Sequence, residues 1–229
     1  MPAPSVAAAT SNVNASGTVL TLTKPGTPAV GDLLVACVGD YDVSNTITPP
    51  GGWTERTTTD HTGTEATYTT LFERVVDGTE GATLDFNFGG SANYLTGAML
   101  LVTGADTSAP YDTHASAASR SSTAVDLPAV TTTVADTLLL SFQIGYNAAV
   151  SVAPSGWTQQ VNWDTVCYAW SRSAASAGVQ GSWAFTLASL STLACAVVAY
   201  KPPGGGPSTV LSPLLGRYVP FTPNYAGRL

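Results

Sequence analysis

Few residues in this sequence combine a reactive type with a spacing that could support chemistry. Each of the two histidines, His61 and His114, has a single aspartate close by, whereas a zinc site usually needs three or four closely arranged ligands. The many serines are not accompanied by a Gly-x-Ser-x-Gly elbow, and no P-loop or dinucleotide-binding glycine pattern opens a helix. The four glutamates lie in the first half of the chain, without the context that marks a glycosidase pair: Glu55, Glu65, Glu73 and Glu80. We therefore expect a non-enzyme with no catalytic residue, no metal and no cofactor.

The cysteines and aspartates lead to a similar expectation. Cys37, Cys167 and Cys195 form no Cys-x-x-Cys motif, and an odd number leaves one unpaired in any arrangement. We expect buried, reduced thiols within strands. A calcium site is conceivable at three aspartates, although no loop shows EF-hand spacing: Asp40, Asp42 and Asp77.

Aromatic residues are the better candidates for binding, because aromatic faces suit the apolar faces of sugars. Candidate glycan contacts lie in loops and near strand ends: Tyr41, Tyr146, Trp157 and Trp163. Trp157 has a counterpart, Trp53, after a similar Pro-x-Gly turn. For this duplicated tryptophan, packing in the core or at its rim is the simpler interpretation.

Composition indicates which elements must position these residues. The chain has 229 residues, of which 44% are hydrophobic and only 10% charged, against about 25% charged in ordinary soluble domains. Abundant threonine favours strands, and 22 glycines and 15 prolines favour turns. The net charge of −7 lacks the basic footprint of a nucleic-acid binder, and no apolar stretch reaches 18 residues. We expect an all-β protein that binds neither nucleic acid nor membrane.

An internal repeat organises the chain. Residues 30–34, Val-Gly-Asp-Leu-Leu, return as Val-Ala-Asp-Thr-Leu at 134–138, an offset of 104 that pairs Asp32 with Asp136. The same offset aligns the two Pro-x-Gly-Trp-Thr runs, and an offset of 98 then aligns Arg74 with Arg172. In both repeats, the arginine is expected to pair with the aspartate or to cap a loop. Such a duplication predicts two copies of one structural unit.

Each repeat contains about six strand-like runs. They are 18–23, 32–39, 53–59, 66–76, 82–88 and 94–103, then 123–127, 137–145, 157–162, 165–173, 181–187 and 193–201. Leu33–Val38 and Leu138–Ile144 are continuously apolar, which is typical of central strands covered on both faces. Glycine pairs such as Gly89-Gly90 suggest hairpin turns. The pattern predicts a jelly-roll-like β-sandwich of two face-to-face sheets related by a pseudo-twofold, and sequence alone does not distinguish one sandwich from two in tandem.

The composition changes after the second repeat. We expect a body over residues 1–203, with repeats at about 16–105 and 122–201, followed by a Gly/Pro hinge and extended arm over 204–229. The arm is apolar, aromatic and basic, unlike the usual polar tail, which suggests docking on another surface. Its candidate docking residues are Leu211, Leu214, Leu215, Arg217, Tyr218, Phe221, Tyr225 and Arg228.

These motifs together resemble a known family. The Gly-Asp-Leu-Leu-Val run, the Pro-x-Gly-Trp-Thr turn, the arginine strand and the joint at 102–112, repeated once, resemble a β-sandwich module of tailed bacteriophages of actinobacteria. Such chains are minor tail proteins or other virion structural proteins. The resemblance covers about residues 5–202 and implies a structural or adhesive role, with no catalytic residue to transfer.

The leading functional hypothesis is therefore a virion component that is displayed on the particle and contacts the host envelope. Capsid decoration, with the arm docked on the head, and a carbohydrate-binding module are the alternatives. Residues 1–5 show neither a basic nor an apolar region, so no signal peptide is expected and the chain would be made in the host cytoplasm. Expected partners are other virion proteins, further copies of the chain within the particle, and a host-envelope glycan.

Overall fold

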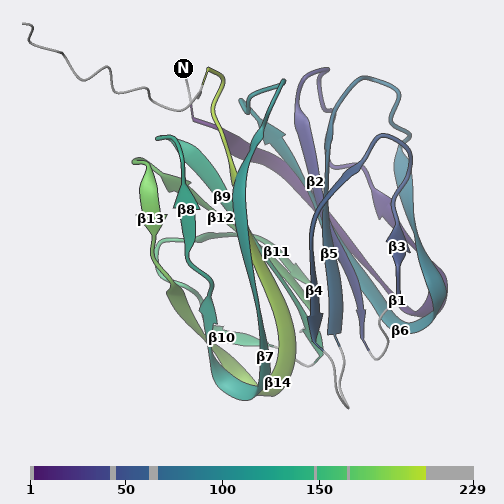
Figure 1. Cartoon of the computed structure of the whole chain (residues 1–229). Coiled ribbons are helices and arrows are strands. Elements are labelled where there is room, and N and C mark those ends of the chain that lie inside the picture. Colours follow the sequence, from purple (N-terminus) through teal and green to yellow (C-terminus); the bar gives the residue numbers. More distant parts are fainter. Residues whose placement is uncertain (1–2, 42–44, 62–66, 147–148, 164–165, 205–229) are drawn as a thin grey trace, which may run out of the picture.

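The computed structural model describes residues 3–41, 45–61, 67–146, 149–163 and 166–204, and every regular element in these ranges is a β-strand (Figure 1). No helix in these ranges is long and apolar enough to cross a membrane. The strands of the first repeat are β1 (Ser5–Thr23), β2 (Leu33–Tyr41), β3 (Ile47–Thr48), β4 (Thr54–His61), β5 (Thr67–Val75) and β6 (Thr83–Thr103). Those of the second are β7 (Tyr111–Leu127), β8 (Val130–Thr132), β9 (Thr137–Tyr146), β10 (Val150–Val152), β11 (Thr158–Trp163), β12 (Cys167–Ala174), β13 (Gly178–Gln180) and β14 (Trp183–Tyr200).

Each repeat forms one antiparallel sheet. The first sheet has the order β1-β6-β2-β5-β4, with β3 also on β6. The second has the order β10-β14-β9-β12-β11, with β7 also on β14, and β8 and β13 form a small separate sheet. Strand β4 contacts β7, and its counterpart β11 contacts β1, as a pseudo-twofold requires. The expected all-β sandwich is confirmed.

The strand register corrects the alignment of the repeats. Leu33 pairs with Val102, and Leu138 pairs with Tyr200, so β2 and β9 correspond with an offset of 105 rather than 104. The extra residue enters beside Asp136, which has φ +55°, a left-handed conformation that only a minority of non-glycine residues adopt. The corrected offset makes Tyr41 the counterpart of Tyr146 at the ends of β2 and β9.

Three hydrophobic cores lie in the sandwich. The interface core, between the two sheets, joins alternate residues of β2, such as Val35 and Cys37, to alternate residues of β9, such as Leu140 and Phe142. The other faces of β2 and β9 pack into a separate core within each repeat. Residues Leu33–Val38 are all at most 1% exposed, which confirms that this central strand is covered on both faces.

The second core of each repeat exists because the outer strands are long and bend. Strand β6 pairs with β2 through its second half and with β3 through Phe88, while β1 follows it along both halves. The expected hairpin at Gly89-Gly90 is therefore wrong. Both glycines lie inside β6, at the point where the strand bends so that its first half covers the second core of the first repeat. The β7–β14 pair curves in the same way (Figure 1).

The first strand of each repeat also starts earlier than the pattern predicts. Strand β1 begins at Ser5 and β7 at Tyr111, not near residues 18 and 123. These added segments consist mainly of alanine, serine and other small or polar residues, so no apolar alternation marks them. They become strands because β6 and β14 pair with most of their residues.

All three cysteines are buried and free, as expected. Burial raises the pKa of Cys167 and of Cys195 to about 12 and raises that of Cys37 well above its ordinary value. Since only the thiolate reacts, a pKa three units above the ordinary value leaves on the order of a thousandfold less thiolate at neutral pH.

We therefore expect the native chain to react negligibly with Ellman's reagent at pH 8 over minutes, whereas the chain in guanidinium should titrate three thiols. The readout is absorbance of the released thiolate. Rapid reaction of even one thiol in the native chain would contradict the burial described here.

Candidate functional site

The predicted glycan contacts separate into three residues at one end of the sandwich and one buried residue, Trp157. Tyr41 and Trp163 end β2 and β11, and Trp163 is 39% exposed while Tyr41 is half-buried. Tyr146 ends β9, and its side chain lies outside the described part of the chain. A Cβ atom on Gly39 would lie 3.2 Å from Ile144 Cδ1, so β2 and β9 finish at the same end of the sandwich. Trp163 pairs with Cys167, the β12 residue opposite Ile144, and therefore belongs to that end as well.

Trp157 does not join this group. Its side chain is only 8% exposed and packs edge-to-face against Trp183, with ring centroids 5.0 Å apart. Trp53 packs similarly on Phe86, with centroids 5.6 Å apart. The packing interpretation of the duplicated tryptophan is therefore correct, and Trp157 has no open face to offer a sugar.

The repeated arginine holds the turn that precedes each tryptophan. Arg172 donates to the carbonyl oxygen of Ser155 at 3.2 Å, and Arg74 donates to that of Gly51. A Cβ atom at Gly52 or Gly156 would lie 2.9 or 2.8 Å from the arginine Nη1 of its repeat, so glycine makes room for the guanidinium. Loop capping, rather than pairing with Asp32 or Asp136, is thus the observed role.

The two arginines differ in their other partners. Arg74 Nε lies 2.9 Å from Glu80 Oε1, and the Glu80 side chain is only 1% exposed. Arg172 instead lies over the Trp183 ring, 5.4 Å from its centroid. Arg74 therefore neutralises a buried carboxylate, and Arg172 does not.

We expect Arg74→Met to destabilise the chain by about 3 kcal/mol, because it leaves the buried Glu80 carboxylate without its cation. Arg172→Met, the matched control, keeps the same aliphatic stem and should cost about 1 kcal/mol, from one hydrogen bond and a cation–π contact. Urea denaturation measures both. Equal losses in the two variants would show that the Arg74–Glu80 pair adds nothing.

A charged cluster lies where β4 and β5 of the first repeat meet β7 and β14 of the second. We call it the filled site; it consists of Arg56, Glu73, Tyr111 and Tyr200. Arg56 Nη2 donates to Glu73 Oε1, and the guanidinium lies 4.5 Å from the centroid of the Tyr111 ring. Glu73 is 3% exposed and Tyr200 is fully buried. Burial, reinforced by the nearby Glu73 carboxylate, raises the pKa of the Tyr200 hydroxyl well above its ordinary value.

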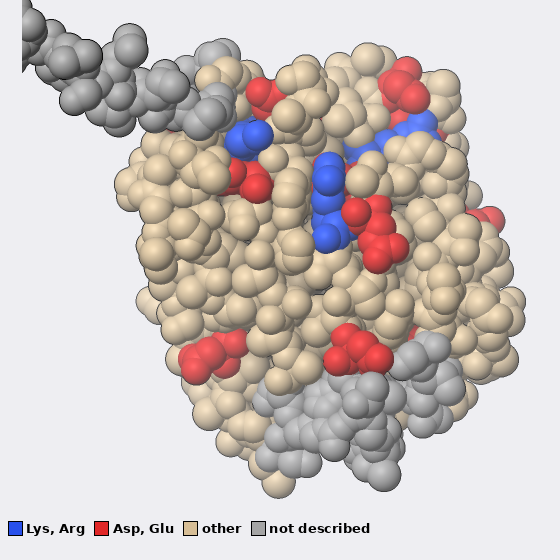
Figure 2. Space-filling model, in the orientation of Figure 1, with Lys and Arg blue, Asp and Glu red and all other residues tan. Residues whose placement is uncertain are grey.

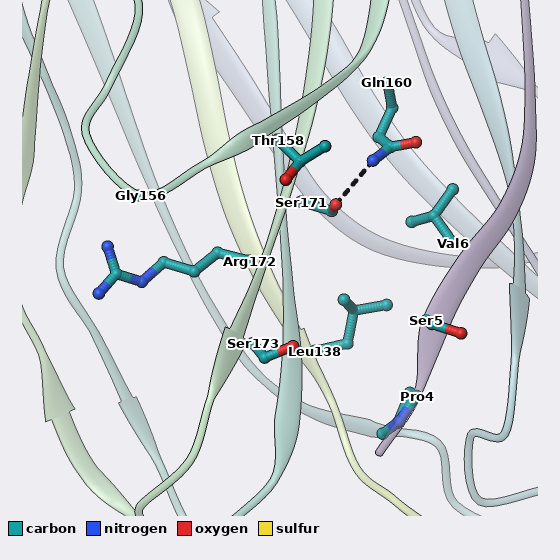
Figure 3. A pocket seen from close by; sticks show the side chains of 10 residues that line it. All are labelled: Pro4, Ser5, Val6, Leu138, Gly156, Thr158, Gln160, Ser171, Arg172 and Ser173. Carbon is teal, nitrogen blue, oxygen red and sulfur yellow. Dashed lines mark hydrogen bonds between the residues drawn. The ribbon is translucent and has the colours of Figure 1, made fainter. Parts of the chain in front are cut away.

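The pseudo-twofold places a hollow at the equivalent position in the other half. We call it the hollow site; it has a volume of about 290 Å³ and lies between the start of β1 and strands β11 and β12 (Figure 3). Its lining residues are Pro4, Ser5, Val6, Leu138, Gly156, Thr158, Gln160, Ser171, Arg172 and Ser173. Sequence reasoning missed both sites, because their residues meet only when the two repeats pack together.

The remaining reactive residues have structural partners. Asp77 accepts hydrogen bonds from Thr79 and from Arg74, which hold its pKa well below the ordinary value, and Asp40 accepts from Asn45. Tyr111 and His114 are hydrogen-bonded to each other. Glu65, Asp42 and the His61 side chain lie outside the described residues. Within the ranges that the structure describes, no three His, Cys, Asp or Glu side chains gather as a metal site would require.

The surface is sparsely charged. Uncharged residues predominate on the face shown in Figure 2, and most of its basic groups lie beside acidic ones. All candidate docking residues of the arm, Leu211 to Arg228, lie outside the described residues. A scan against family models, a search of curated proteins and a search of solved structures each found no match to this chain.

Proposed function

We propose that this chain is a non-enzymatic structural protein of a bacteriophage virion, a minor tail or other surface-displayed component that contacts the host envelope. The observation that carries the proposal is the polarity of the sandwich. Tyr200, where the last strand ends, pairs with Leu138 at the start of β9, whereas Thr192 pairs with Tyr146 at its end. At about 3.3 Å per residue, the exit of the chain and the aromatic strand ends are about 26 Å apart.

This polarity suits a displayed module. The arm leaves from one end, where Lys201 donates to the carbonyl oxygen of Pro110 and accepts from the amide of Asp106, which ties the exit to the connection between the repeats. The opposite end presents Tyr41 and the exposed Trp163. A body attached through its arm would therefore hold the aromatic end away from the particle. The sequence resemblance to phage tail modules supports the same role.

The proposal is tested on purified particles of the phage that encodes the chain. Mass spectrometry should detect the chain in the virion, and cryo-electron microscopy should place it on the tail with the Trp163 end outward. Density on the head would favour capsid decoration instead. Absence of the chain from purified particles would refute a virion role altogether.

Deleting residues 207–229 should leave a folded, soluble body that no longer enters particles. The deletion removes the apolar arm and leaves every described strand intact. Burying several large side chains, at about 1.5–3 kcal/mol each, is what would hold the arm on a neighbouring subunit. Incorporation is measured by quantitative mass spectrometry of particles, with circular dichroism as the folding control. Wild-type occupancy of the truncated chain would contradict the docking role.

A further inference from the structure

The filled and hollow sites are counterparts, residue by residue. In strand register, Thr54 pairs with Glu73 and Thr158 pairs with Ser171, so Ser171 occupies the position of Glu73. Two residues after that threonine, each edge strand has a β-bulge. The bulged residue is Arg56 in β4 and Gln160 in β11, so Gln160 occupies the position of Arg56.

The third counterpart comes from the strand that crosses from the other repeat. Tyr111 pairs with Tyr200, and Val6 pairs with Val102, the residue that corresponds to Tyr200. A register shift follows directly in both strands. Val6 therefore occupies the position of Tyr111, and it lines the hollow site.

Val102 also replaces Tyr200, and the other three differences lie among the residues that line the cavity. In the filled site, the Arg56 guanidinium, the Glu73 carboxylate and the Tyr111 ring occupy the space between the repeats. In the hollow site, the shorter side chains of Gln160, Ser171 and Val6 leave a pocket of about 290 Å³ that is open to solvent. The gap is thus a specific feature of one interface rather than a general looseness of packing.

The lining defines the chemistry of a ligand. Hydroxyl groups come from Thr158, Ser171 and Ser173, and Gln160 Nε2 donates to Ser171 Oγ at 2.8 Å. The side chains of Leu138 and Val6 provide apolar surface beside these polar groups (Figure 3).

Among the lining residues in the described part of the chain, only Arg172 is charged. Figure 3 shows its guanidinium pointing away from Gln160 and Val6, toward the turn that it caps. The cavity therefore offers neutral hydrogen-bonding groups and a small apolar surface, but no charge to bind an ion.

We propose that the hollow site binds one ring of a neutral sugar. Hydroxyl and amide groups match the donors and acceptors of a sugar, and the aliphatic side chains match its C–H face. The volume lies at the lower limit of ordinary ligand pockets, which suits a single ring rather than a longer chain. This site is separate from the aromatic strand ends and does not depend on the proposed virion role.

The first experiment is saturation-transfer NMR on the full chain with glucose, galactose, rhamnose, arabinose and N-acetylglucosamine. At least one should bind with a dissociation constant on the order of 1 mM, a weak affinity in keeping with so small a contact. Failure of all five to bind would overturn the proposal. Binding should survive Trp163→Ala, and its loss in that variant would move the sugar site to the aromatic end.

The pseudo-twofold supplies the decisive variants. Val6→Tyr with Gln160→Arg and Ser171→Glu copies the filled site into the cavity and should weaken binding at least tenfold. Gln159→Arg, one residue away on the same strand and outside the lining, is the matched control and should bind as the wild type does. Unchanged binding by the folded triple variant would refute the site.

The reciprocal variant keeps the test informative if filling disturbs folding. Tyr111→Val with Arg56→Gln and Glu73→Ser should open a second cavity and raise the stoichiometry from one sugar to two per chain. Residue-resolved NMR titration distinguishes one perturbed site from two at this affinity, because resonances beside β4 and β5 should shift as well as those beside β11 and β12. A stoichiometry that stays at one would contradict the assignment of the hollow site.

Discussion

Gly39→Ala is expected to destabilise the chain more than the same substitution at any other glycine of the described strands. A Cβ atom on Gly39 would lie 2.2 Å from the carbonyl oxygen of Tyr68 in the neighbouring strand and 3.2 Å from Ile144 Cδ1 in the facing sheet. The first contact involves backbone, which cannot rotate away, and the second lies in the closely packed interface core. The pseudo-twofold makes Ile144 the counterpart of Gly39, so a large residue on one strand requires a small one on the other.

Overpacking of this kind costs about 3 kcal/mol, which for a chain of this size lowers the melting temperature by roughly 6–12 °C. Differential scanning calorimetry measures the shift. Gly181→Ala is the matched control, because a Cβ atom there meets nothing within 4 Å. It should change stability by less than about 0.5 kcal/mol. Equal melting temperatures for the two variants would mean that β2 and β9 do not pack as described.

Arg56→Gln is the second change with a large expected effect. It removes the cation from Glu73, whose side chain is 4% exposed, and so leaves a buried carboxylate without its ion-pair partner. Loss of one member of such a pair costs about 3–5 kcal/mol, most of it the cost of burying the remaining charge. Urea denaturation should show this loss as a lower transition midpoint with an unchanged slope.

The double variant Arg56→Gln with Glu73→Ser should recover most of that stability. It reproduces the Gln160–Ser171 pair that the second repeat already tolerates, and it leaves no charge to neutralise. Glu73→Ser alone should cost less than Arg56→Gln, because the Arg56 side chain is 28% exposed and its guanidinium can reach water. A double variant that is no more stable than Arg56→Gln would contradict this account of the filled site.

Several features followed from the sequence because their physical causes are local or periodic. The continuously apolar run Leu33–Val38 is typical of a strand covered on both faces, and the structure places it at the centre of the first sheet. The Pro-x-Gly-Trp turns were visible as repeated motifs, since a left-handed residue before the tryptophan requires glycine, as at Gly156 with φ +78°. The absence of a Cys-x-x-Cys motif likewise agreed with three buried thiols.

The other features depended on contacts between distant parts of the chain. Strand β6 continues through Gly89-Gly90, although a glycine pair is locally a turn signal, because β1 pairs with it on both sides of the bend and the Gly89 amide donates to the carbonyl oxygen of Thr46 beside β3. A tryptophan after a turn can face either the core or solvent. Trp157 is a core residue because the Trp183 ring, which comes from a distant strand, packs against it.

The filled and hollow sites show the same limit most clearly. Arg56, Glu73 and Tyr111 lie on three strands from two repeats, as do Gln160, Ser171 and Val6. No local pattern marks these residues, because their relation is created by the pseudo-twofold itself. Sequence determined the all-β class, the duplication and the central strands. Only the packing of one repeat on the other decided which interface is closed by an ion pair and which is left open, because an ion pair and a cavity are both properties of the space between elements.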